Sequence, residues 1–236
     1  SYAAKMLAAY YSKGADSDSL FQGLEISNTD TYRNYLNKYN VLFLDIAWFI
    51  SIASNIEKTV TEMQENIIEE LKETFPDMIG KSVHSLPVAL LQISARTGQK
   101  FFIIIDEWDA LFREASADET IQKSYIQLLR ALFKGVQISQ FLAGAYMTGI
   151  LPIKKYGTLS ALTDFREFSM LEPGFLAEYV GFTEKEVKDL CQTNHMDFAE
   201  ANKWYNGYRF NKIGHVYSPN SIIEAMMMDA MFEIPS

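Results

Sequence analysis

One run of apolar residues, FFIIIDEWDALF at 101–112, constrains the fold more than any other part of this sequence. Five apolar residues in succession predict a strand buried on both faces, which is typical of a parallel sheet covered by helices. The run ends in Asp106 and Glu107, and a further acid follows at Asp109. Open α/β sheets place their ligand crevice at the carboxyl ends of such strands. The segment therefore predicts a buried parallel strand with a candidate site at its end.

Two interpretations of Asp106 and Glu107 are open from this segment alone. A buried strand can simply end in two solvated acids. Adjacent carboxylates at this place also form the Walker B pattern, in which one supports Mg²⁺ and its neighbour activates a water for attack on a γ-phosphate. A second predicted strand within 137–149 runs into Thr148. This hydroxyl suits a polar γ-phosphate sensor, and the alternative is a loop hydroxyl that caps its own backbone.

The remaining elements alternate between strands and helices, which predicts a parallel sheet with helices on both faces. Further strands are predicted at 41–46 and 166–171, and helices at 1–14, 54–75, 84–97 and 119–134. Ser54 and Glu57 have capping-box spacing at the start of one helix. After Pro173 the pattern changes to short capped helices. We therefore expect an α/β core at 1–173 and a small helical subdomain at 174–236.

Composition narrows the classes of function. The chain has 236 residues, 48 per cent of them hydrophobic, and a formal charge of −9. The acidic balance disfavours direct binding to nucleic acid or to an anionic membrane. Cys191 is the only cysteine, and no apolar run reaches the length of a membrane span. These features predict a cytoplasmic protein with a large core.

The first residue also bears on the candidate site. Ser1 is followed directly by an amphipathic helix. In a phosphate loop of the form GxxxxGK[ST], the last residue binds Mg²⁺ and the next begins a helix whose amide groups attract phosphate. The simpler alternative is that Ser1 is an ordinary helix cap.

Several segments together resemble the AAA-ATPase-like family of uncharacterised bacterial proteins. In chain order they are SYAAKMLAAYYSKG, VLFLDIAWFI, FFIIIDEWDALF, AYMTGILPIKKYGTLSALTDFREFSM, DFAEANKWYNGYRF and YSPNSIIEAM. The resemblance covers essentially the whole chain. It implies a P-loop NTPase-like domain of three layers with a parallel sheet, followed by a small C-terminal helical lid. It also implies ATP and Mg²⁺ as ligands.

The resemblance assigns roles to individual residues. Ser1 matches the last Walker A residue, and with Asp106 it would bind the cofactor and the metal. Glu107 matches the second Walker B acid and Thr148 the sensor. Arg166 matches a family arginine that would neutralise phosphate charge during catalysis. The alternative for Arg166 is an ion pair with a neighbouring acid, Asp164 or Glu167.

The resemblance also suggests what lies beyond this chain. Family members carry Gly-Lys immediately before the residue matched by Ser1, and many continue into a nuclease-like domain. We therefore expect that the natural chain extends upstream of Ser1, and that residues 1–236 alone bind nucleotide weakly and are inactive. We expect this longer natural protein to hydrolyse ATP. Its nucleotide state would be relayed through the lid to another copy or to a partner protein. The alternative is a non-hydrolysing nucleotide switch or an interaction module.

Overall fold

The computed structural model describes residues 1–152, 162, 164–205, 207–210 and 213–232. Residues 153–161, which belong to the family-like segment AYMTGILPIKKYGTLSALTDFREFSM, lie outside the described part. The chain divides into two compact units, Ser1–Phe165 and Arg166–Ser236. Each unit is described by itself below.

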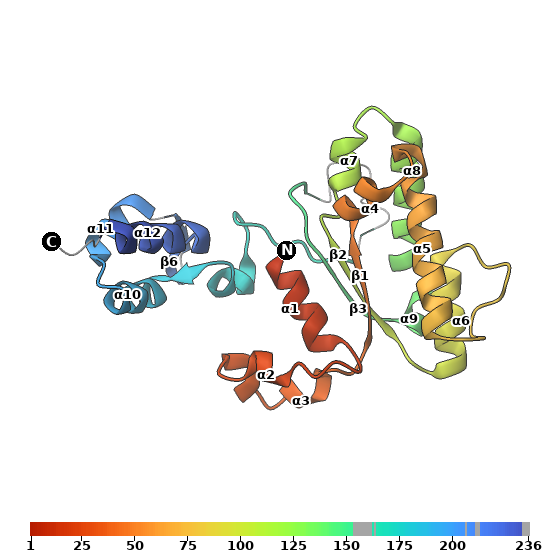
Figure 1. Ribbon diagram of the computed structural model, residues 1–236, viewed down its shortest axis with the longest axis horizontal. Helices are drawn as coiled ribbons and strands as arrows, with labels where there is room; N and C mark the ends of the chain where they lie inside the picture. The colour runs from red at the N-terminus through yellow and green to blue at the C-terminus, as the bar shows by residue number, and fades with distance from the viewer. Residues whose placement is uncertain (153–161, 163, 206, 211–212, 233–236) are drawn as a thin grey trace. The chain divides into compact units, whose positions relative to one another are not determined.

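The first unit is built on a three-stranded parallel sheet with the order β1-β2-β3 (Figure 1). The strands are β1 Asn40–Asp45, β2 Phe101–Asp106 and β3 Leu142–Met147. The α-helices are α1 Tyr2–Tyr11, α2 Asp18–Phe21, α3 Tyr32–Tyr35, α4 Ile46–Ile52, α5 Thr59–Thr74, α6 Leu86–Thr97, α7 Ala110–Glu114, α8 Glu119–Phe133 and α9 Ile138–Phe141. Short 3-10 helices span Glu25–Asn28 and Ile56–Lys58.

The central strand, β2, confirms the prediction of a buried parallel strand. Ile103, Ile104 and Ile105 have no exposed surface. Parallel partners lie on both sides, since Asp45 pairs with Asp106 along β1 and Met147 pairs with Ile105 along β3. Covering helices explain the burial, because a sheet that lies between two layers needs apolar residues on both faces.

Helices cover the two faces of this sheet in different ways (Figure 1). On one side, α5, α6 and α8 join β2 in a single apolar core. On the other side lies α1, whose Tyr11 ring stacks on Phe102 of β2 with centroids 4.1 Å apart. Gly144 of β3 leaves room for this ring, because a Cβ at that position would lie 2.7 Å from a Phe102 ring carbon. The unit is therefore a mixed α/β fold with a parallel sheet, as predicted.

The second unit contains an antiparallel sheet as well as the predicted helices. Its sheet has the order β4-β6-β5. The elements are a 3-10 helix Gly174–Tyr179, β4 Phe182–Thr183, α10 Glu184–Thr193, α11 Phe198–Tyr205, β5 Tyr208–Phe210, β6 Gly214–Tyr217 and α12 Pro219–Phe232. Thr183 and Glu186 form a capping box at the start of α10. The predicted boundary at 173/174 lies a few residues after the start of this unit, and the lid role of residues 174–236 stays a prediction.

Two local predictions were wrong. No strand forms at 166–171, because Ser169 and Glu172 exchange backbone hydrogen bonds that turn the chain. The helix predicted from Ser54 begins as an α-helix only at Thr59, since Ser54 bonds to the Glu62 carboxylate in place of a capping box with Glu57. The strand predicted within 137–149 forms as β3, and the short helix α9 precedes it.

Among the described residues, no helix is both long enough and apolar enough to cross a membrane.

Candidate functional site

Acidic side chains lie where the parallel strands end. Asp45 and Asp106 are register partners at the ends of β1 and β2. Asp45 has a structural role, because its Oδ1 accepts a hydrogen bond from the Trp48 amide, 3.0 Å away, and caps α4. Asp106 and the following Glu107 therefore form the acidic pair available at this edge of the sheet.

The structure brings Asp106 together with Ser1 and Thr148. Asp106 is buried, with 4% of its surface exposed. Its Oδ1 accepts a hydrogen bond from the Thr148 hydroxyl, and its Oδ2 contacts the amino nitrogen of Ser1. The Ser1 Oγ accepts a hydrogen bond from the Ala4 amide at 3.3 Å and caps α1. The positive end of a helix dipole thus faces a buried carboxylate.

The turns after β2 and β3 are joined by hydrogen bonds at Thr148. The Thr148 amide donates to the Ile105 carbonyl at 2.9 Å, and its own carbonyl accepts from the Trp108 amide at 2.9 Å. The Glu107 amide lies 3.3 Å from the Thr148 hydroxyl oxygen and donates to it. The predicted sensor therefore contacts both acids of the predicted pair, although its one hydroxyl proton is directed to Asp106.

Glu107 differs from its neighbour in backbone and environment. Its φ of 52° is left-handed, an uncommon conformation for a residue with a side chain. Its carboxylate is half exposed, and Oε2 accepts a hydrogen bond from Arg113 Nη2 at 2.7 Å. This hydrogen bond raises the pKa of the Arg113 guanidinium above its ordinary value. Glu107 is therefore a solvent-accessible carboxylate held on one of its two oxygens.

The Asp109 side chain holds the segment after Thr148 in place through hydrogen bonds. The side chain is fully buried, and Oδ2 accepts from the amides of Ile150 and Leu151 at 3.3 and 3.0 Å. Arg113 Nε lies 3.3 Å from the same oxygen, close enough for an ion pair but not aligned as a hydrogen bond. The buried charge of Asp109 is thus compensated by the guanidinium that also holds Glu107.

Arg166 belongs to the second unit. There its guanidinium lies over the rings of Phe168 and Phe175, with centroids 5.1 and 5.2 Å away. Both distances are within the range of a cation–π interaction. The structure therefore brings Ser1, Asp106, Glu107 and Thr148 together, whereas the assignment of Arg166 to the same site stays a prediction.

Comparison with known families agrees with this arrangement. The family model AAA-ATPase_like, described as a predicted AAA-ATPase, matches residues 1–159. The chain belongs to the AAA-ATPase-like family. No curated protein and no solved structure matches it.

In an AAA-ATPase-like chain, a metal site at the strand ends would have to offer donor atoms that suit Mg²⁺. The polar side chains of Asp106, Ser1 and Thr148 offer only oxygen, which hard cations prefer. Among the described residues, no group of three or more His, Cys, Asp or Glu side chains could hold a metal ion. That finding does not count against Mg²⁺, because nucleotide sites hold it through one or two protein oxygens, substrate phosphates and water.

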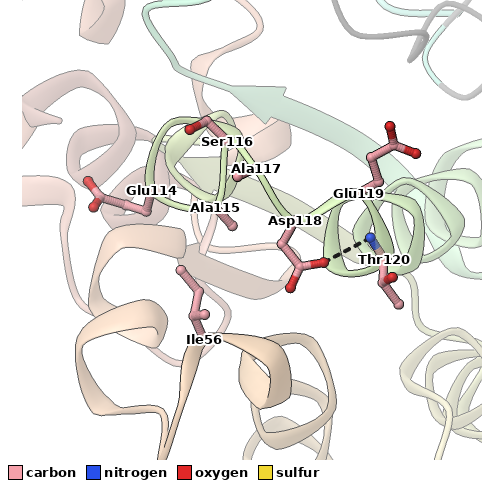
Figure 2. Close-up of a pocket in the computed structure, with 8 residues that line it drawn as sticks. All are labelled: Ile56, Glu114, Ala115, Ser116, Ala117, Asp118, Glu119 and Thr120. Atoms are coloured by element: carbon pink, nitrogen blue, oxygen red, sulfur yellow. Dashed lines mark hydrogen bonds between the residues drawn. The ribbon is translucent and has the colours of Figure 1, made fainter.

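The chain also has an open pocket of about 700 Å³ beside the turn between α7 and α8 (Figure 2). It is lined by Ile56, Glu114, Ala115, Ser116, Ala117, Asp118, Glu119 and Thr120. Asp118 is occupied as the cap of α8, where its Oδ1 accepts from the Thr120 amide at 2.9 Å (Figure 2). The lining includes three acidic residues, Glu114, Asp118 and Glu119, and no basic one, which disfavours an anionic ligand in this pocket.

Sequence reasoning missed two residues of the site. Arg113 follows Asp109 at the i, i+4 spacing of a helical ion pair, so that pair could have been predicted. Its second contact, with Glu107, depends on the left-handed turn and carries no sequence signal. Gly149 was also missed: a Cβ there would lie 2.5 Å from the Trp108 ring, so the turns after β2 and β3 meet as closely as they do only with glycine.

Proposed function

We propose that this chain is the catalytic core of an ATPase that hydrolyses ATP by in-line attack of water on the γ-phosphate. One observation carries the proposal: Asp106 at the end of β2 contacts both Thr148 and Ser1, and Ser1 lies at the N-terminus of α1. A helix N-terminus favours phosphate, and a buried carboxylate beside it favours a cation bound to that phosphate. Family membership supports the same reaction.

Glu107 orients the attacking water and accepts its proton in this proposal. Its Oε2 is held by Arg113, whereas Oε1 has no hydrogen-bond partner among the residues that the structure describes. A carboxylate fixed on one oxygen can align a water on the other, which lowers the barrier by positioning. Glu107 rather than Asp106 fits this role because Asp106 is buried and its Oδ1 accepts a hydrogen bond from the Thr148 hydroxyl.

Asp106 and Ser1 would hold Mg²⁺, with Asp106 acting through the water shell of the ion. When bound, the ion would supply positive charge against the phosphate oxygens. The Thr148 hydroxyl would turn from Asp106 toward the γ-phosphate and report its presence. Arg166 would add charge compensation, and residues 174–236 would act as a lid that relays the nucleotide state to another copy or a partner protein.

Turnover by the natural full-length protein tests the proposal. We expect Glu107→Gln to lower kcat by about a hundredfold or more while ATP binding, measured by calorimetry with Mg²⁺, is retained. Glu119→Gln is the matched control, because Glu119 is an exposed acid that pairs with Lys123 away from the strand ends. Equal turnover in wild type and Glu107→Gln would remove the assigned role of Glu107. ATP binding without turnover in the wild type would favour a non-hydrolysing nucleotide switch instead.

A further inference from the structure

The proposed mechanism uses Arg113 only as a hydrogen-bond donor to Glu107, but the guanidinium has a second acidic partner, Asp109. The guanidinium bridges Glu107, at 2.7 Å from Nη2, and Asp109, at 3.3 Å from Nε. The two acids differ sharply in exposure: the Glu107 side chain is half exposed and the Asp109 side chain is fully buried. Arg113 itself is about a third exposed. The bridge therefore connects a fixed internal charge to a carboxylate at the surface of the site.

The Asp109 end of this bridge is the anchored one. Asp109 Oδ2 also accepts the amides of Ile150 and Leu151, so its position is fixed by the backbone after β3. If Arg113 left Asp109, a buried carboxylate would lose its compensating charge, which is strongly unfavourable. Arg113 therefore stays on Asp109 and presents Nη2 to Glu107.

The Glu107 end has few other restraints. The Glu107 amide bonds to Thr148, but its side chain extends from a left-handed residue into partly exposed space. An unrestrained glutamate of this kind samples several rotamers, and each misplaced rotamer fails to align a water. One charged hydrogen bond from an anchored guanidinium selects one of them.

We infer that Arg113 is a positioning residue that holds Glu107 in the orientation needed for water attack and couples that orientation to the 149–151 turn. The inference rests on the proposed ATPase function. It adds a residue that would contact neither the nucleotide nor the attacking water and would act through Glu107. The path runs from the amides of Ile150 and Leu151 to Asp109, then to Arg113 and Glu107.

The test measures kcat and KM for ATP in the natural full-length protein and its Arg113 variants. Arg113→Gln is expected to lower kcat about tenfold or more and to leave KM within about twofold, because positioning acts on the transition state and not on ATP binding. Arg113→Lys should fall between Arg113→Gln and wild type, since an ammonium keeps the charge but cannot bridge both acids. Arg33→Gln is the control: Arg33 pairs with Asp18 at 3.0 Å on an exposed surface.

A double-mutant cycle separates positioning from a general structural effect. In a Glu107→Gln background, Arg113→Gln should cause no further loss of kcat, because its target is already gone. A further loss of the same size as in wild type would overturn the inference, and so would an unchanged or raised kcat in Arg113→Gln alone. If the wild type shows no ATP turnover, the proposed function fails and the inference with it. Normal wild-type turnover with unaffected Arg113 variants removes the inference alone.

Discussion

Substituting Gly149 with alanine tests whether the turns after β2 and β3 are in contact as described. The added Cβ would lie 2.5 Å from Cδ1 and Nε1 of Trp108 and 2.6 Å from Oδ1 of Asp109. Carbon atoms do not approach other heavy atoms this closely, so one of the groups has to move. Trp108 is 3% exposed and Asp109 is fully buried, so neither side chain can move away without disturbing the core.

The expected loss of stability follows from two opposing effects. Forcing an extra methyl group into a packed site costs about 1–3 kcal/mol. Replacing glycine also restricts the unfolded chain, which returns about 0.4–1 kcal/mol. We expect a net loss of about 1–2 kcal/mol in the free energy of unfolding. For a unit of this size, each kcal/mol lowers the Tm by about 2–4 °C, so the Tm should fall by about 2–8 °C.

Tryptophan fluorescence during thermal unfolding is a suitable assay, because buried Trp108 reports on this region. Trp204 lies in the second unit and should be replaced by phenylalanine, so that the signal comes from the first unit. Gly80→Ala is the matched control: a Cβ there would be 3.5 Å from its nearest neighbour, an ordinary contact. The reasoning is refuted if Gly149→Ala and Gly80→Ala unfold at the same temperature.

Two further predictions concern other polar groups of the first unit. Burial raises the pKa of the Tyr125 hydroxyl, and this hydroxyl has no hydrogen-bond partner among the described residues. Tyr125→Phe should therefore raise the free energy of unfolding, measured in urea, by about 1 kcal/mol. A loss of that size would show that the hydroxyl has a partner. Hydrogen bonds from Ser54 lower the pKa of Glu62 below 4.5, so its stabilising effect is present above pH 4.5 and disappears as the pH falls through the folded-state pKa. The urea midpoint of Glu62→Gln should therefore depend less on pH between about 3 and 6 than that of wild type; parallel profiles would contradict this.

The parts of the fold that sequence predicted well are those with strong local patterns. β2 is a continuous apolar run, and α8 carries a regular stripe that includes Ile121, Tyr125 and Leu132, all buried. Such segments can be predicted without knowing their neighbours in space, because burial alone dictates the residue type. The proximity of Asp106 and Thr148 was also predictable, since parallel strands end at one edge of a sheet.

The missed elements depend on contacts that a local pattern does not contain. β4 and β5 have only two and three residues, too few to show an alternation of apolar and polar side chains. The apolar residues at 166–171 resemble a strand, yet Phe168 packs against Arg166 and the chain turns at Ser169. In each case tertiary contacts decided the structure over local propensity.

The candidate site shows why adjacent acids can differ in role. In a continued strand, Glu107 would project from the face of the sheet opposite to Asp106. The left-handed φ of Glu107 ends the strand instead, so that its amide reaches Thr148 and its carboxylate reaches Arg113 on α7. This conformation costs about 1 kcal/mol or more and persists only where surrounding contacts enforce it. The left-handed backbone at the half-exposed acid of the pair supports the proposed role of Glu107, since it directs the carboxylate to Arg113 and away from Asp106.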